Sequence, residues 1–272
     1  MGYINYKILK HELPDNMQWL KNRTILLTRT GSHAYGTNTP ESDEDYRGVC
    51  IPPPEYYLGL KSINEYNTSG GKNFVTNGPE DVDITVTHIN KFVRDALNGV
   101  PNNLDILFCR DEDIIYIDDF GKELRAMRKN FLSKALKHKF CGYAHSQKHK
   151  LIIKKGNGTG RQELVEKYGY DTKFAMHAVR LLTSVIEILE THDYQTYRPN
   201  REWLLEIRNG KYTLEEIFEI LDKLEARVEE LYVTSDLPEH CDYNKINDWL
   251  IDINRKALDY DFCCPCQDID KK

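Results

Sequence analysis

The second half of this 272-residue sequence limits the possible folds most strongly, because it contains long amphipathic patterns and almost no strand signals. From about Phe131 onward, apolar residues recur at the spacing of helices. The first half instead alternates short helical and extended stretches, separated by Gly, Pro, Asn and Ser. The sequence therefore predicts an α+β fold, in which a mixed α/β domain is followed by an all-helical domain.

We expect the mixed domain to span residues 1–128, the helical domain to span residues 129–262, and a cysteine-containing tail to follow over residues 263–272. Three glycines over residues 156–160 predict a flexible loop within the helical part. In the same part, a capping box at Thr213 and Glu216 predicts the start of one helix. Apolar residues at helical spacing predict another from about Tyr243 to Leu258.

Net charge and hydropathy exclude several classes of protein. The formal net charge is -6 and the pI is about 5.9, whereas a chain that coats nucleic acid non-specifically needs a basic surface. A local basic cleft is still compatible with these values. The N-terminus lacks the apolar core of a secretory signal, and no apolar run approaches the length of a membrane span. We expect a cytoplasmic protein with no membrane partner.

The seven cysteines do not form the pattern of a disulfide framework, because their number is odd and their spacing is scattered. Cys263 and Cys266, with Cys264 between them, have the CxxC spacing of zinc sites. However, no second pair or nearby histidine pair supplies the other two ligands that structural zinc requires. We therefore predict a reduced tail.

A buried strand over residues 24–28 leads directly into Gly31 and Ser32. Glycine allows close approach of a ligand to the backbone, and a serine at the start of a helix adds a hydroxyl and free amide donors that suit a phosphate. The alternative is an ordinary strand-to-helix turn with Ser32 as the helix cap.

Asp43 and Asp45 follow in the segment ESDEDYRGV. If this segment is extended, the two-residue period of a strand places both carboxylates on one face. Two such carboxylates repel each other unless a cation such as Mg²⁺ lies between them. The alternative is a solvated acidic turn.

A third acid is predicted on another strand. Apolar and polar residues alternate strictly over residues 82–87, so Asp83 shares a polar face with Thr85 and Thr87. Two-metal transfer chemistry uses carboxylates from neighbouring strands. Asp81 has the same parity and is the alternative third ligand.

These residues are similar to the signature of the DNA polymerase β superfamily of nucleotidyltransferases, in which a Gly-Ser pair precedes an Asp-x-Asp pair and a later strand Asp. Three stretches resemble the branch known as RNA-ligase-associated nucleotidyltransferases: Gly31 to Leu60, Asp83 to Phe108 and Tyr168 to Leu182.

The resemblance implies a small mixed sheet that carries the acids, a helical C-terminal part, and metal-dependent transfer of a nucleoside monophosphate with release of pyrophosphate. It implies that Gly31 and Ser32 hold the triphosphate and that Asp43 and Asp45 bind the metal ions. Asp83 would help to activate the acceptor hydroxyl.

A basic stripe is predicted on a helix that Asp171 or Thr172 caps. Lys173, His177 and Arg180 fall at i, i+4 and i+7, so that their nitrogen donors line one side. With the resemblance, we favour phosphate binding by this stripe in a helical domain that binds substrate or nucleotide. The alternative is a solvated basic stripe that pairs with Glu187.

Other polar residues near these motifs have two interpretations. His33, Tyr35 and Arg47 flank the acids and are candidate nucleotide contacts, although a helix-turn histidine and a local ion pair explain His33 and Arg47 equally well. The basic stretch CGYAHSQKHK, which includes Gln147 and Lys148, suggests an acidic substrate, and a solvated helix face explains it as well.

We therefore expect an enzyme in which an acceptor hydroxyl attacks the α-phosphorus of a nucleoside triphosphate such as ATP. Asp43, Asp45 and Asp83 would hold Mg²⁺ or Mn²⁺, with two ions in the usual scheme. An RNA end is one candidate acceptor, and it rests on the branch name alone. Two other functions remain open: a nucleotide-binding regulatory protein without turnover, and an antitoxin-like nucleotidyltransferase that modifies a partner protein.

Overall fold

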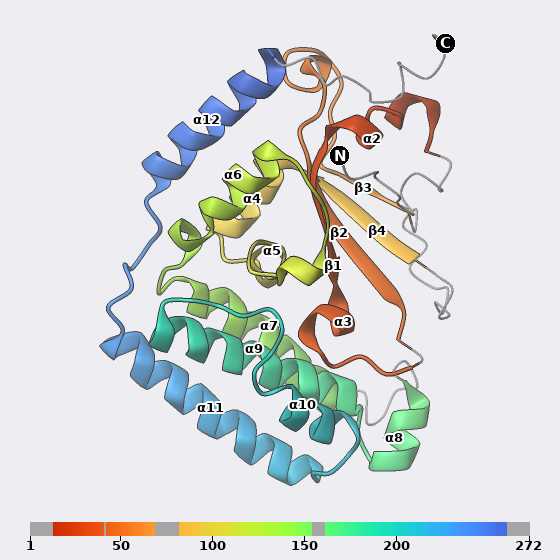
Figure 1. The fold of residues 1–272 in the computed structure, drawn as a ribbon. Coiled ribbons are helices and arrows are strands. Elements are labelled where there is room, and N and C mark those ends of the chain that lie inside the picture. The colour runs from red at the N-terminus through yellow and green to blue at the C-terminus, as the bar shows by residue number, and fades with distance from the viewer. Residues whose placement is uncertain (1–12, 41, 69–81, 154–160, 260–272) are drawn as a thin grey trace.

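A five-stranded mixed sheet forms the centre of the N-terminal part (Figure 1). The computed structural model describes residues 13–40, 42–68, 82–153 and 161–259, apart from the side chains of residues 82, 152, 153 and 259. Among the described residues the strand order is β3-β4-β2-β1-β5, in which β2 and β4 pair in parallel and the other neighbours pair antiparallel. The strands are β1 (Thr24–Thr30), β2 (Glu44–Cys50), β3 (Glu65–Asn67), β4 (Val82–His88) and β5 (Ile114–Ile117).

Apolar side chains cover both faces of the sheet. On one face, Leu27, Tyr46 and Ile84 pack against Met17 of the 3-10 turn η1 (Asp15–Met17) and Leu20 of α2 (Leu20–Arg23). On the other face, residues such as Ile25 and Val49 pack against helices in the larger hydrophobic cluster. The helices of this N-terminal part are α3 (Gly31–Tyr35), α4 (Ile89–Leu97), α5 (Pro101–Leu107) and α6 (Asp119–Ala126), with short turns η2 (Pro54–Tyr56), η3 (Asp111–Asp113) and η4 (Arg128–Phe131).

The described chain after β5 is helical. Its long helix α9 packs against α7, α10 and α11. Last, α12 returns to the N-terminal part, where the Asn254 Nδ2 atom donates to Asn90 Oδ1 of α4 at 2.8 Å (Figure 1). The helices are α7 (Leu136–Ile153), α8 (Gln162–Tyr168), α9 (Thr172–Thr191), α10 (Arg201–Arg208), α11 (Leu214–Thr234) and α12 (Tyr243–Asp259). The predicted α+β class, with a small mixed sheet followed by helices, is confirmed.

The predicted helix starts agree with the observed caps. Thr213 and Glu216 form both hydrogen bonds of the capping box at α11. At α9, Asp171 rather than Thr172 is the cap, because its carboxylate accepts from the N–H groups of Lys173 and Phe174. These side chains satisfy amide donors that the first helical turn leaves without partners.

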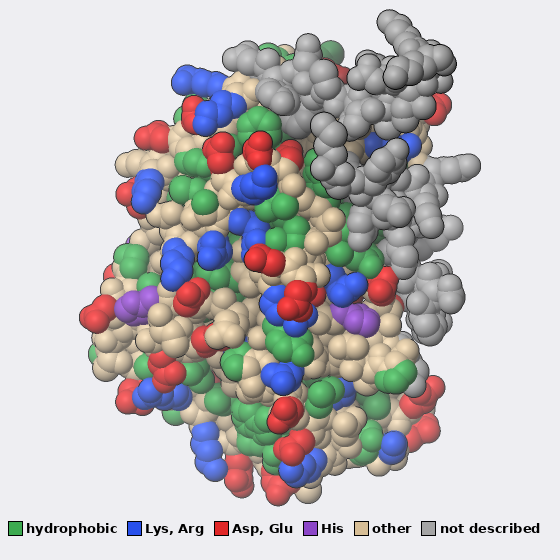
Figure 2. Space-filling view, in the orientation of Figure 1, with side chains coloured by type: hydrophobic (Ala, Val, Ile, Leu, Met, Phe, Trp, Pro, Cys, Tyr) green, Lys and Arg blue, Asp and Glu red, His purple; other side chains and the backbone are tan. Residues whose placement is uncertain are grey.

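Basic and acidic side chains are interspersed on the face that Figure 2 shows, without a large region of one sign. None of the helices in the described ranges combines the length and the apolar character that crossing a membrane requires.

One hydrophobic cluster extends from Ile25 of β1 to Ala257 of α12, across the expected domain boundary at residue 128. Asp81, the loop over residues 156–160 and the cysteines of the tail lie outside the described residues.

Candidate active site

Three aspartates approach one another at one end of β2 and β4. Because these strands are parallel neighbours, Asp45 and Asp83 are Cα partners in the register, and Asp43 lies directly before β2. Tyr46 and Ile84, which alternate with them, are buried on the opposite face at 5% and 1% exposure. Burial, together with the negative charges of Asp43 and Asp83, raises the pKa of Asp45 to about 6. The three acids therefore form one electrostatic cluster.

The donor chemistry of these acids fits a hard divalent cation. The repulsion that raises the pKa of Asp45 is the kind that a bound cation removes. Within the described residues, no three His, Cys, Asp or Glu side chains stand close enough together to hold a metal ion by themselves. Mg²⁺ commonly binds through one or two carboxylates and completes its shell with water and substrate phosphate. The cluster therefore suits an ion that the protein and a phosphorylated substrate share.

The turn from β1 into α3 lies directly against Asp45. Gly31 has a φ of +66°, and a Cβ atom at this position would overlap the Oδ2 atom of Asp45. Only glycine therefore fits this turn without strain. Thr30, not Ser32, is the N-cap residue of α3, and its side chain makes no cap hydrogen bond. The interpretation of Ser32 as the cap is thus wrong, and Ser32 is the second residue of the helix.

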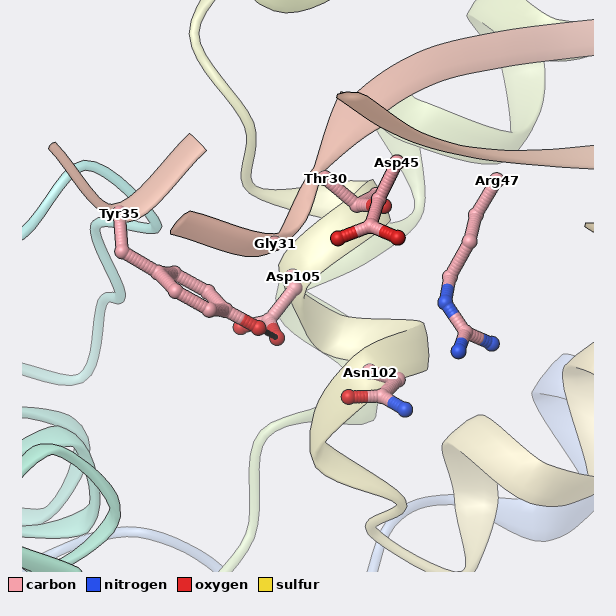
Figure 3. A pocket seen from close by; sticks show the side chains of 7 residues that line it. All are labelled: Thr30, Gly31, Tyr35, Asp45, Arg47, Asn102 and Asp105. Carbon is pink, nitrogen blue, oxygen red and sulfur yellow. Dashed lines mark hydrogen bonds between the residues drawn. The ribbon is translucent and has the colours of Figure 1, made fainter. Parts of the chain in front are cut away.

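A small pocket of about 110 Å³ opens beside Asp45. Figure 3 shows the Asp45 carboxylate, the Arg47 guanidinium and the Asn102 amide around the same space. The positive charge of Arg47 lowers the pKa of Asp45 and so opposes the acids. The pocket is lined by Thr30, Gly31, Tyr35, Asp45, Arg47, Asn102 and Asp105.

A second, larger pocket of about 280 Å³ adjoins the first, because both include Gly31, Tyr35 and Asn102. It lies between α3, α5, α7 and α9, and its other lining residues are Val100, Pro101, Tyr143, Gln147, His177, Arg180 and Leu181.

The sequence prediction missed both Asn102 and Asp105, which line the smaller pocket. Asn102 is an exposed polar residue one position after the proline that begins α5. An asparagine near the start of a helix is common for local structural reasons, so the sequence alone does not mark it as a site residue.

The predicted basic stripe of α9 is divided among different surroundings, and Lys173 is the member nearest the acids. Burial and the positive charges of Arg161 and Arg208 lower the pKa of Lys173, while Asp43 and Asp45 oppose this shift. Lys173 also lowers the pKa of Asp45. A positive amine thus faces the carboxylate cluster from the helical part.

His177 lines the larger pocket as a neutral ring. Burial and the positive charges of Arg180 and Lys173 lower its pKa to about 3. Its Nδ1 atom is buried and has no hydrogen-bond partner among the described residues. At neutral pH the ring is therefore uncharged.

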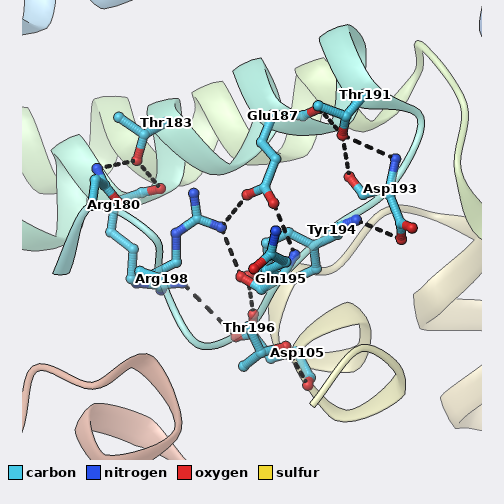
Figure 4. A network of polar contacts seen from close by, with 11 residues as sticks. Asp105, Arg180, Thr183, Glu187, Thr191, Asp193, Tyr194, Gln195, Thr196 and Arg198 are labelled. Carbon is cyan, nitrogen blue, oxygen red and sulfur yellow. Dashed lines mark hydrogen bonds and ion pairs between the residues drawn. The ribbon is translucent and has the colours of Figure 1, made fainter. Parts of the chain in front are cut away.

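Arg180 is buried at 5% exposure and stacks on Tyr35, with its guanidinium carbon 3.9 Å from the ring centroid. Its Nη1 atom lies 3.9 Å from the carboxylate of Asp105. The hydroxyl groups of Tyr35 and Tyr194 both donate to that carboxylate, the former at 2.6 Å (Figures 3 and 4). Arg180 therefore belongs to a buried polar network with Tyr35, Asp105 and Tyr194, and it also lines the larger pocket.

Glu187 does not form an ion pair with Lys173, His177 or Arg180. The alternative that the basic stripe of α9 pairs with Glu187 is therefore wrong. Glu187 forms an ion pair with Arg198, which is 1% exposed (Figure 4). The same arginine donates to the carbonyl of Gln195 at 2.8 Å. This pair fixes the segment after α9, and the backbone N–H of Arg198 donates to the carbonyl of Tyr35.

Comparisons with known proteins identify a family. The family model RlaP, described as the RNA repair pathway DNA polymerase beta family, matches residues 9–252. Over 135 residues the chain is 29% identical to an uncharacterized 38.9 kDa protein in the nrdC-mobD intergenic region of enterobacteria phage T4, which covers 48% of this chain and 40% of that protein. The chain thus matches less than half the length of this relative.

Among solved structures, a nucleotidyltransferase-like protein from Exiguobacterium sibiricum 255-15 is similar at 12% identity. The alignment covers 80% of this chain and 73% of that chain, with a TM-score of 0.29.

Proposed function

This chain belongs to the RNA repair pathway DNA polymerase beta family, and on that premise we propose that it transfers a nucleoside monophosphate from a nucleoside triphosphate to a hydroxyl group of an RNA end. One observation carries the proposal. Asp45 has a pKa raised by burial and by Asp43 and Asp83, while Lys173 faces the same cluster. A carboxylate beside a pocket whose pKa is shifted by burial and by neighbouring charges is typical of a functional site.

In this proposal, Asp43, Asp45 and Asp83 hold Mg²⁺ or Mn²⁺, two ions in the usual scheme. Such ions, when bound, neutralise charge on the attacking and leaving oxygens. Gly31 and Ser32 hold the triphosphate, because the turn brings the backbone against Asp45. Lys173 contributes positive charge for the phosphates, with Arg161 and Arg208 near it. His177 and Arg180 contact the nucleotide from the larger pocket.

The chemical step is an exchange of oxygen atoms at the α-phosphorus. The acceptor oxygen forms a bond to this phosphorus, the bond to the oxygen that bridges to the β-phosphate breaks, and pyrophosphate leaves. The acceptor proton passes to a carboxylate of the cluster, for which Asp83 is the residue we assign. Arg47 and Asn102 orient groups in the smaller pocket, which they line together with Asp45.

The test is label transfer from each α-labelled nucleoside triphosphate, with Mg²⁺ or Mn²⁺, to RNA, protein or small molecules. We expect RNA to take the label and Asp45→Asn to reduce the rate at least about 100-fold. The matched control is Asp248→Asn, which changes an exposed acid of α12 and should leave the rate unchanged. Nucleotide binding without label transfer under either metal would contradict the proposal, as would transfer to protein alone.

A further inference from the structure

Helix α7 carries two sets of basic residues on different sides. Its residues 136–153 include four lysines and three histidines and no aspartate or glutamate. Lys137 forms an ion pair with Glu229 of α11, and Lys148 forms ion pairs with Asp222 and Glu225 of the same helix. Acidic residues of α11 therefore neutralise these two lysines, and the ion pairs link α7 to α11.

The other side of α7 carries a second stripe. Lys139, Tyr143, Gln147 and Lys150 occur at i, i+4, i+8 and i+11, which places them along one side of the helix over a rise of about 16 Å. We call these four residues the α7 stripe. Lys139 and Lys150 form no ion pair with any residue in the described part of the chain. The stripe therefore keeps its positive charge, although the whole chain is acidic.

The α7 stripe is continuous with the candidate active site. Tyr143 and Gln147 line the larger pocket, which shares Gly31 and Asn102 with the pocket beside Asp45. Tyr143 is 45% exposed, so its ring is both part of the pocket and open to a ligand.

The two ends of the stripe reach neighbouring elements. A Cβ atom at Gly99, in the turn between α4 and α5, would lie 3.7 Å from Lys139. The Lys150 amine lies 5.4 Å from the ring centroid of Phe174 at the start of α9. The stripe thus runs from the turn before α5 to the start of α9.

We propose that the α7 stripe binds the single-stranded end of the RNA acceptor and leads it to Asp45. This inference rests on the proposed function and adds the place of the acceptor. Sites for single strands combine positive charge along the phosphates with aromatic rings on which bases stack. Lys139 and Lys150 supply the charge, Tyr143 supplies an accessible ring, and the Gln147 amide offers both a donor and an acceptor to a base edge.

An acidic peptide is the competing occupant of a basic stripe. The exposed ring of Tyr143 beside the amide of Gln147 favours a base over a carboxylate side chain, because stacking and edge recognition are useful only to a planar partner. The absence of acidic residues from α7 suits either ligand, so the ring is the feature that distinguishes them.

The test measures binding of a short fluorescein-labelled single-stranded RNA by anisotropy, without nucleoside triphosphate. We expect Tyr143→Ala to weaken binding about 5-fold to 100-fold, and Tyr143→Phe to retain it, because the ring and not the hydroxyl stacks. Lys139→Ala should lower the slope of log Kd against log salt by about 0.7, the value for one phosphate contact on a single strand. Lys223→Ala, on exposed α11 surface, is the control and should match the parent.

Several results would overturn the inference: no RNA binding by the parent, Tyr143→Ala and Lys139→Ala binding as tightly as the parent, or an unlabelled poly-glutamate peptide competing as well as unlabelled RNA. The changed side chains are exposed, and unfolding curves for each variant confirm that it is folded. Label transfer to a different acceptor, with no RNA binding, would remove this inference and the RNA acceptor while leaving nucleotidyl transfer intact. Failure of all label transfer would instead remove the proposed function.

Discussion

Asp45 and Asp83 lie side by side because β2 and β4 are parallel neighbours and their register pairs these two residues. The two-residue period of strands placed Asp45 and Asp83 on the polar faces of β2 and β4, and the structure confirms those two faces, whereas Asp43 lies directly before β2 and is not part of the strand. Asp105 could not be found in this way. It is one acid between Leu104 and Ile106 of α5, and its partners Tyr35 and Tyr194 lie 70 and 89 positions away. No local pattern contains such pairings.

At Gly31 we predict that substitution by alanine removes activity. The new Cβ atom would require a strained positive φ and would displace the carboxylate of Asp45. Misplacement of a reacting group by about 1 Å costs on the order of 100-fold in rate, so label transfer should fall at least that far. Gly169→Ala is the control, because its φ of +81° is equally strained while no atom lies within 4 Å of the added carbon. Equal activity of the two variants would contradict the role of Gly31.

At the scale of elements, caps were predictable and the orientation of a helix was only partly so. The capping box of α11 and the aspartate cap of α9 depend on neighbouring residues, and both are observed. Spacing alone placed Lys173, His177 and Arg180 on one side of α9. It could not show that Tyr35 of α3, which is distant in sequence, stacks on Arg180, or that Lys173 interacts with the acids.

Helix α4 gives a prediction about pH. The neutral ring of His88 caps it, since His88 Nδ1 accepts from the N–H of Asn90 at 3.0 Å. Burial and the positive charge of Arg94 lower the pKa of His88 to about 4. Because the unfolded residue titrates near pH 6.5, its contribution to stability is complete above that pH and is lost as pH falls toward 4.

The expected loss at pH 5 is about 2 kcal/mol relative to pH 7. We expect His88→Asn, which keeps a capping acceptor but does not titrate, to lose less stability over this range by about that amount. Urea unfolding of both proteins at the two pH values measures the difference. Parallel pH profiles for parent and variant would rule out a neutral histidine cap.

At the scale of the whole molecule, one polar network joins parts that the sequence treats as separate domains. Asp105 of α5 accepts from Tyr35 of α3 and from Tyr194, and its backbone carbonyl accepts from Thr196 at 2.8 Å. Arg180 of α9 completes it. This network, and the return of α12 to α4, hold the helical part against the sheet, and neither follows from periodicity.

We predict that Asp105→Ala destabilises the protein by about 3–5 kcal/mol, because it leaves Arg180 buried without its charge partner. Asp111→Ala removes an acid that is 92% exposed and should change stability by less than about 1 kcal/mol. The free energy of unfolding in urea measures both effects. An Asp105 variant as stable as the Asp111 variant would show that the network does not join the two parts.

The central claim is that this cluster of acids catalyses transfer of a nucleotide and not of a terminal phosphate. Parallel reactions with a nucleoside triphosphate labelled at the α- or the γ-phosphorus, with Mg²⁺ and an RNA acceptor, test it directly. We predict that the α-label joins the RNA, that the γ-label appears only in pyrophosphate, and that Asp45→Asn slows formation of both products at least about 100-fold. Transfer of the γ-label to RNA, or full activity of Asp45→Asn, would contradict the claim.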